Sequence, residues 1–76
     1  MTPAALAVVA EKAVRFGADL RPGQAAWSAL YDVDERLACQ IQGTASDPYH
    51  DDTNLPRFWL AVTEAALDQD YEEETA

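Results

Sequence analysis

The sequence predicts an all-α fold, a small bundle of three to four short helices. Three observations support this prediction. Apolar residues recur at intervals of three and four along much of the chain, which is the spacing of one helix face. No segment of useful length alternates apolar and polar residues, so we expect no strand. Proline, glycine and short polar residues interrupt the pattern where helices usually begin and end.

The first helix is expected from Pro3 to Phe16. The Thr2 hydroxyl can cap its N-terminus, and the proline that follows suits a first turn because its missing N–H would be unpaired anyway. Gly17 can end the helix. Glu11 and Arg15 are spaced to form an ion pair on the outer face. The inner face consists of Leu6, Val9, Ala10, Ala13 and Gly17.

Residues 22–43 predict two further helices, or one helix with a kink. The later helix is expected to begin after Asp32, with Glu35 reaching back to this cap as in a capping box. Gly43 is a suitable end for it. The apolar face of the earlier helix consists of Ala26, Trp27, Leu30 and Tyr31, and that of the later helix of Val33, Leu37 and Ile41.

A last helix follows an ordered loop and has the strongest amphipathic face in the chain. Thr53 or Asn54 is expected to cap it, with Pro56 in its first turn. Its core face consists of Leu55, Phe58, Trp59, Val62, Ala65 and Ala66.

Residues 1–67 are expected to form a single helical domain, and residues 68–76 an acidic tail that is frayed or disordered. A domain of this size buries only about 60% of the surface of its unfolded chain, so its stability is modest. Cys39 lies inside a helical pattern and is interpreted as a small buried hydrophobe. The larger core candidates are Leu6, Val9, Phe16, Trp27, Leu30, Tyr31, Val33, Leu37, Ile41, Leu55, Phe58, Trp59 and Val62.

The formal charge of −9 is unevenly distributed, because residues 44–76 hold nine acids and a single cation, Arg57. Direct binding of nucleic acid requires cations that face phosphates, so we exclude it. The acidity either serves solubility or attracts a partner with a basic surface. No apolar run approaches the length of a membrane span, and Glu11 and Lys12 interrupt the apolar N-terminal segment, so we expect neither a membrane helix nor a signal peptide. The expected location is the cytoplasm.

The stretch "GTASDPYHDDTNLPRFW" concentrates acids around the only histidine, His50. Calcium requires six to eight oxygen ligands, and the EF-hand spacing is missing. Zinc requires three or four ligands of the His or Cys type, and the chain has one of each. No nucleophile elbow or glycine-rich phosphate loop is present. We therefore expect no metal, no cofactor and no enzymatic activity, and interpret the stretch as a structural loop built by Asp47, Pro48, Tyr49, Asp51 and Asp52.

About half of the chain, from Arg21 to Trp59, resembles the R-x-G-Q-A … I-x-G-T-x-x-D-P-(F/Y)-x-D-D … F pattern of small uncharacterised acidic proteins of actinobacterial phages and their hosts. The resemblance implies a setting, the bacterial host cell, and no activity. The matching residues are Arg21, Gly23, Gln24, Ala25, Ile41, Gly43, Thr44, Asp47, Pro48, Tyr49, Asp51, Asp52 and Phe58.

The last helix carries a second apolar stripe, Leu60, Leu67 and Tyr71, roughly 100–150° around the helix from its core face. The stripe either completes the bundle or offers a surface to another chain. Glu64 and Asp68 flank it and would give such a surface an acidic rim.

Three functions remain open at this point. The first is a small non-enzymatic protein-interaction module, phage-encoded, that binds and modulates a basic host protein through the last helix and its acidic flank. The second is a structural or assembly protein that forms a small homo-oligomer through the Leu60, Leu67 and Tyr71 stripe. The third is an acidic DNA mimic that inhibits a nucleic-acid-binding protein.

Overall fold

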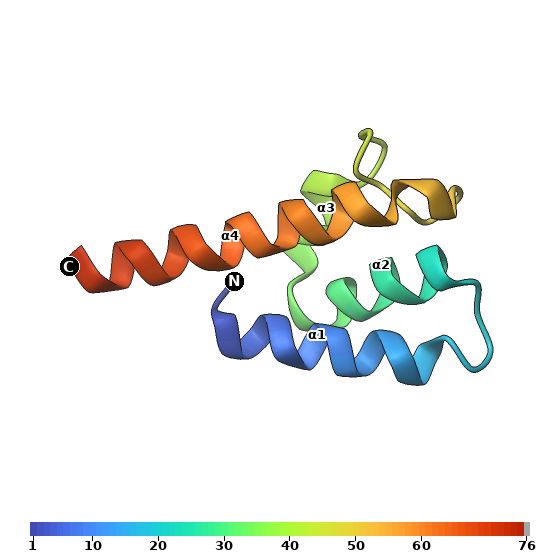
Figure 1. Cartoon of the computed structure of the whole chain (residues 1–76), viewed down its shortest axis with the longest axis horizontal. Helices are drawn as coiled ribbons and strands as arrows, with labels where there is room; N and C mark the ends of the chain where they lie inside the picture. Colours follow the sequence, from blue (N-terminus) through green and yellow to red (C-terminus); the bar gives the residue numbers. More distant parts are fainter. Residues whose placement is uncertain (76) are drawn as a thin grey trace.

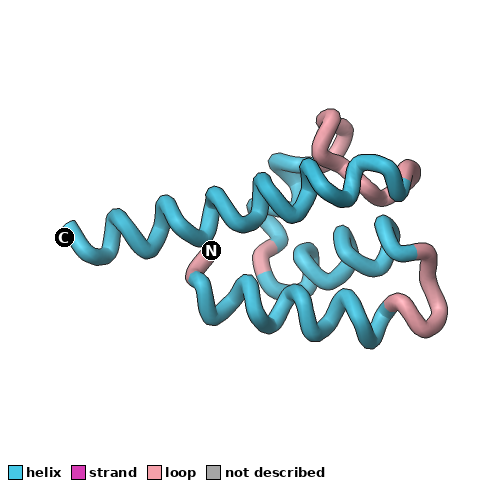
Figure 2. Tube along the Cα trace, in the orientation of Figure 1, coloured by secondary structure: helices cyan, strands magenta, loops and turns pink. Residues whose placement is uncertain are grey.

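The computed structural model describes residues 1–68 with their side chains and residues 69–75 by their backbone (Figures 1 and 2). It confirms the all-α prediction, with no strand among these residues. The predicted tail of residues 68–76 lies, apart from Asp68, outside the residues whose side chains are described. The elements are α1 (Pro3–Phe16), α2 (Pro22–Val33), α3 (Glu35–Ile41), the 3-10 turn η1 (Asp52–Asn54) and α4 (Leu55–Thr75).

Helix α2 lies at the centre of the packing, because it contacts α1, α3 and η1, and α1 in turn contacts α4. Helix α2 returns alongside α1, and α4 runs in the same direction as α2 (Figure 1). The short α3 packs on α2, and η1 joins the start of α4 to α2. Phe58 of α4 is fully buried where these helices meet. The core cluster consists of Val9, Ala26, Ala29, Leu30, Ala38, Ile41, Phe58 and Val62.

The N-terminal helix agrees with its prediction at both ends. The backbone N–H of Ala5 donates to the Thr2 hydroxyl oxygen at 3.1 Å, so the threonine caps α1 as expected. The expected pair between Glu11 and Arg15 is also present. Gly17 ends the helix. These features are local in sequence, which is why the amino-acid pattern alone was sufficient to place them.

The predicted boundary between α2 and α3 is wrong by two residues. The two helices are separate, and the cap is Asp34, whose carboxylate accepts from the Leu37 N–H at 3.1 Å. Asp32, the predicted cap, stays in the last turn of α2 and pairs with Lys12 at 2.6 Å. The Trp27 indole N–H donates to the Ala38 carbonyl at 3.1 Å, a contact that requires α3 to fold back on α2.

The start of α4 is also a correction. Neither Thr53 nor Asn54 caps it, because η1 extends the helical path backward by one turn. Asp51 takes the capping role, and its Oδ1 accepts from the Thr53 N–H at 2.9 Å and from the Thr53 hydroxyl at 2.6 Å. The Asn54 amide instead donates to the Asp47 carbonyl at 3.0 Å.

Three core predictions also need revision. Cys39 is exposed, since the buried side of α3 runs through Ala38 and Ile41 instead. Tyr31 is 43% exposed, and its hydroxyl donates to Glu35 at 2.8 Å, a hydrogen bond that raises the pKa of Tyr31. Trp59 is only half-buried and packs at the edge of the core.

Candidate functional site

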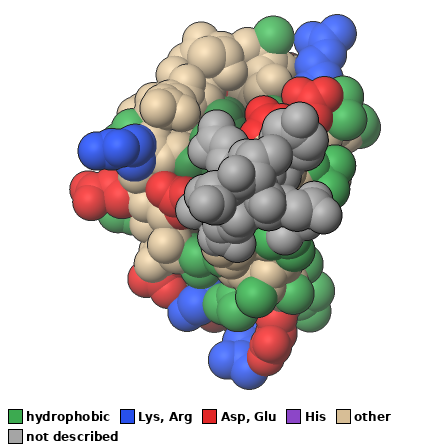
Figure 3. All heavy atoms as spheres, turned by 90° about the vertical axis from the view of Figure 1, so that its left-hand side faces the viewer, with side chains coloured by type: hydrophobic (Ala, Val, Ile, Leu, Met, Phe, Trp, Pro, Cys, Tyr) green, Lys and Arg blue, Asp and Glu red, His purple; other side chains and the backbone are tan. Residues whose placement is uncertain are grey.

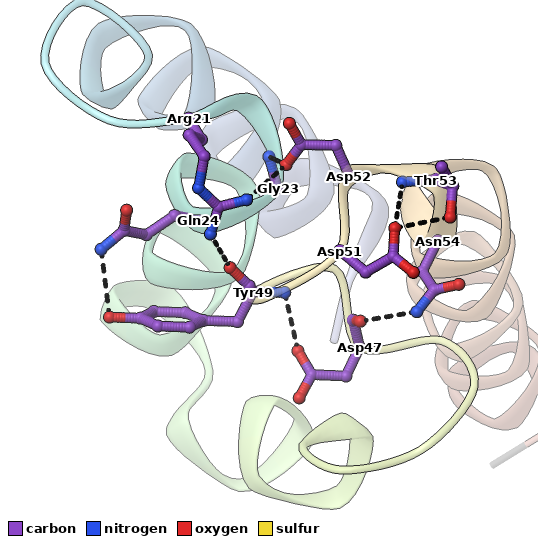
Figure 4. Close-up of polar contacts among 9 residues, drawn as sticks. All are labelled: Arg21, Gly23, Gln24, Asp47, Tyr49, Asp51, Asp52, Thr53 and Asn54. Carbon is purple, nitrogen blue, oxygen red and sulfur yellow. Dashed lines mark hydrogen bonds and ion pairs between the residues drawn. The ribbon is translucent and has the colours of Figure 1, made fainter.

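The loop before α4 is fastened to the N-terminus of α2 by a set of polar contacts that we call the clasp (Figure 4). Helix α2 has no cap of its own, because Arg21 precedes it and makes no capping hydrogen bond. Asp52 supplies the missing acceptor, since its Oδ1 receives the Gly23 N–H at 2.9 Å and the Arg21 guanidinium at 3.0 Å. A carboxylate at this position pairs with an otherwise unpaired helical N–H and with the positive end of the helix dipole.

Gly23 is required by the close approach of the loop. A Cβ at this position would lie 2.0 Å from the Pro48 carbonyl oxygen and 2.6 Å from Oδ1 of Asp52. Neither atom can withdraw without moving the loop, because Pro48 is fully buried and Asp52 is held by its hydrogen bonds. The glycine therefore allows the clasp to close.

Tyr49 attaches the loop to α2 through both its backbone and its side chain (Figure 4). Its carbonyl accepts a hydrogen bond from the Arg21 guanidinium. Its hydroxyl oxygen accepts from the Gln24 amide at 3.1 Å, and its ring meets Trp27 edge-on at a centroid distance of 5.5 Å. Tyr49 was expected to help build the loop, and no sequence signal marked Gln24 or Trp27 as its partners.

Asp47 organises the interior of the loop. Its two carboxylate oxygens accept from the Gly43 N–H at 2.8 Å and the Tyr49 N–H at 2.9 Å. Gly43 has a φ of 80°, which favours glycine at this turn. The structure thus places the five predicted loop residues in one region: four make these polar contacts and Pro48 is buried beneath them.

These contacts involve several residues of the R-x-G-Q-A … D-P-(F/Y)-x-D-D pattern in the sequence. Arg21, Gly23 and Gln24 lie on α2, and their partners lie in the loop, Asp52 and Tyr49 among them. The pattern thus describes a contact that stabilises the fold, and it assigns no chemistry.

The acidic residues of the described chain form no metal centre. Among residues 1–68, no group of three or more His, Cys, Asp and Glu side chains is arranged to hold a metal ion. His50 is exposed, with its ring against that of Tyr49 at 4.8 Å. The Asp51 carboxylate caps η1, and the hydrogen bonds that it accepts from the hydroxyl and N–H of Thr53 lower its pKa below the ordinary value of 3.8.

A partly enclosed pocket of about 280 Å³ adjoins the clasp, and no sequence signal predicted it. The Trp27 and Tyr49 rings meet at 87° and form a corner. Its lining residues are Trp27, Gln42, Asp47, Tyr49 and His50.

A shallow apolar groove of about 620 Å³ lies between α1 and α4. Val14 on one side is 79% exposed, and half-buried Trp59 lies on the other. The only sequence signal for it is the run of small residues along α1. The lining residues are Ala10, Ala13, Val14, Gly17, Ala18, Pro22, Ala26, Leu55 and Trp59.

The predicted partner-binding residues lie on the outer face of α4. Leu60 and Leu67 are each 59% exposed, so this stripe does not complete the core. At 100° per residue they lie roughly 180–200° from buried Phe58, on the opposite side of the helix. Glu64 and Asp68 are exposed. We call these four residues the α4 outer face; the fifth predicted residue, Tyr71, lies outside the described side chains.

Comparisons add no family to this description. No protein-family model, curated protein or solved structure matches this chain. Within residues 1–68, no helix has both the length and the apolar character needed to cross a membrane.

Proposed function

We propose that this chain is a non-enzymatic protein-interaction module that binds a partner with a basic surface through the α4 outer face. The observation that carries the proposal is the exposure of Leu60 and Leu67, 59% each, on the side of α4 opposite its buried residues. Scattered single hydrophobes are normal on a surface, whereas two leucines two turns apart on one face form a stripe that another helix or groove can cover.

Charge specifies the chemistry of the partner. Glu64 and Asp68 make no hydrogen bond or ion pair with another described residue, and both flank the leucines. The second half of the chain, residues 44–76, has a formal charge of −8. A complementary partner therefore has an apolar centre and a rim of Lys and Arg, and the charges speed and orient its association. The resemblance to phage proteins would make this partner a host protein, whose activity the binding modulates.

Self-association is the second candidate, because the seven-residue spacing of Leu60 and Leu67 also suits a seam between two copies. The same face would then bring Glu64 and Asp68 close to the same residues of the second copy, and this repulsion costs free energy.

A DNA mimic needs acidic side chains along one face that make no hydrogen bond or ion pair within the protein. Here most described acids are engaged, and the end of the molecule in Figure 3 mixes acidic, basic and apolar side chains.

The test is capture of a partner from an actinobacterial lysate by three tagged proteins, at low and at high salt. They are the wild type, Leu67→Asp and a matched control, Val14→Asp, which places the same charge on an exposed apolar residue of α1. We expect a basic protein that is retained at low salt by the wild type and Val14→Asp, and lost with Leu67→Asp. High salt should release it, because exposed charges are screened.

Two results would contradict the proposal. Capture that survives Leu67→Asp but fails with Val14→Asp would move the interface to the groove between α1 and α4. Sedimentation of the wild type as a dimer that Leu67→Asp converts to a monomer, with no other protein captured, would favour self-association.

A further inference from the structure

The pocket beside the clasp has a composition suited to one kind of ligand. Two aromatic rings, Trp27 and Tyr49, meet at nearly a right angle. The Asp47 carboxylate, the Gln42 amide and the His50 imidazole complete the lining. The faces of aromatic rings are electron-rich and attract cations. No Lys or Arg side chain lines the pocket, so the fixed charge that it offers is negative.

We infer that this pocket binds a cationic head group, a guanidinium or an alkylammonium, against the corner formed by the Trp27 and Tyr49 rings and next to the Asp47 carboxylate. The volume fits this assignment. About 280 Å³ falls just below the range of roughly 300–1,000 Å³ typical for drug-sized molecules, and it accommodates the end of a side chain.

The walls of the pocket are held in place before any ligand arrives. The indole N–H of Trp27 donates to the Ala38 carbonyl at 3.1 Å, and the hydroxyl of Tyr49 accepts from Gln24 at 3.1 Å. A second ring, Tyr31, stacks on Trp27 at 5.3 Å. Binding therefore does not have to order these aromatic side chains, a cost that weakens association in flexible sites.

Two hydrogen bonds hold the Asp47 carboxylate in place, and it can still accept another from a ligand. Each of its oxygens receives one backbone N–H, from Gly43 and from Tyr49, and a carboxylate oxygen has a further lone pair for a ligand. The basic side chain of the clasp, Arg21, is engaged by Asp52 and the Tyr49 carbonyl. The negative charge of Asp47 would repel an anionic ligand, so the pocket favours cations over anions.

The source of the cation is a basic protein segment, an assignment that rests on the proposed function. A partner with Lys and Arg at its rim would place one of these side chains in the pocket. A free quaternary ammonium compound shares the same chemistry, and the experiment separates the two sources.

The experiment follows the indole N–H signals by NMR on the full chain. Trp27 lines the pocket, and Trp59 lines the groove, which shares no lining residue with the pocket, so the second tryptophan is an internal control. The probes are acetyl-arginine amide, acetyl-lysine amide, choline and, as a neutral counterpart of arginine, acetyl-citrulline amide. We expect the cationic probes to shift Trp27 saturably in about the millimolar range and to leave Trp59 unchanged.

A matched pair of variants tests the charge requirement. Gln42→Lys places a fixed cation in the lining and should weaken binding about tenfold. Gln40→Lys makes the same charge change at an exposed position outside the lining and should bind as the wild type does. Gln42→Glu should strengthen binding. Both positions are exposed, so all three variants should fold.

The outcomes separate cleanly. Stronger binding of arginine or lysine amide than of choline supports a protein segment as the source, and the reverse order supports a cation site for a small molecule. A Trp27 signal that does not move, that moves equally with citrulline amide, or that moves equally in Gln42→Lys overturns the inference. Loss of partner capture in Leu67→Asp is measured independently, so either proposal can fail alone.

Discussion

The clasp and the α4 outer face are both rich in acids and use them in opposite ways. In the loop that carries the clasp, Asp47, Asp51 and Asp52 all accept hydrogen bonds from backbone or side-chain donors, and Asp52 accepts from α2. On α4, Glu64 and Asp68 are exposed and make no such contact with another described residue. The comparison shows that an acidic composition has no single meaning. The same carboxylate either replaces a missing backbone partner or remains available to a second molecule.

The largest expected effect on stability comes from the buried face of α4, which the outer face can be compared with. Phe58→Ala should lower the free energy of unfolding by about 3–5 kcal/mol, because Phe58 is fully buried. Trp59→Ala should cost less, since Trp59 is half-buried at the edge of the core. Thermal and urea unfolding of the two variants measure the difference. Equal losses of unfolding free energy in the two variants would indicate that Trp59 lies at the centre of the core.

Gly23→Ala tests whether the clasp must close tightly. The added methyl group would overlap the Pro48 carbonyl, so either the loop detaches or the start of α2 moves. We expect a loss of about 2–4 kcal/mol in the free energy of unfolding, in the range of other strained core substitutions. Gly17→Ala is the control, because its new Cβ would meet no atom closer than 3.2 Å. Similar losses for both glycines would contradict the account of the clasp.

Asp52→Ala removes the acceptor that α2 borrows from the loop. A lost cap costs about 1 kcal/mol, and the freed Arg21 adds little because both side chains of that pair are largely solvated. Asp68→Ala is the matched substitution on the α4 outer face and should change stability by less than about 0.5 kcal/mol. Chemical unfolding measures the free energy of unfolding of both variants. A larger loss for Asp68→Ala than for Asp52→Ala would contradict the structural role assigned to Asp52.

Asp51 should contribute to the loss of stability at acidic pH. Its pKa is lowered in the folded state by the hydroxyl and N–H of Thr53, so its contribution is complete above the unfolded value near 4. That contribution disappears as the pH falls through the lower folded value. Unfolding curves collected below pH 5 should show a shallower loss for Asp51→Asn than for the wild type. Parallel losses in the two proteins would contradict the capping role.

Leu67→Asp should have the smallest effect on the fold, within about 0.5 kcal/mol, because the side chain is 59% exposed. Its effect on partner capture should be large. A melting temperature well below that of the wild type would show that Leu67 belongs to the structural core.

The sequence predicted those features whose causes are local. Thr2, Pro3 and Gly17 define α1 because capping and turn preferences act over a few residues. The α2–α3 boundary was misplaced because Asp32 and Asp34 are equally good caps, and the choice between them depends on where α3 folds back to meet Trp27.

The sequence did not predict the contacts between segments that lie far apart along the chain. The bond from Gly23 to Asp52 joins residues 29 positions apart, and no periodicity or spacing in a single sequence marks such a pair. The aromatic pocket was missed for the same reason, since Trp27 and Tyr49 come from α2 and from the loop. Helical spacing placed Leu60 and Leu67 on a face away from Phe58, but spacing alone left open whether that face is buried or exposed.

The central claim is that clasp acids hold the fold while the acids of the α4 outer face serve a partner. The most direct test measures unfolding and partner capture together for Glu64→Gln/Asp68→Asn and for Asp52→Ala, which removes the acceptor of the Gly23 N–H. The account predicts that the first variant keeps wild-type stability and loses capture, whereas the second loses stability and, once folded, still captures the partner. Undiminished capture by Glu64→Gln/Asp68→Asn, or unchanged stability in Asp52→Ala, would contradict it.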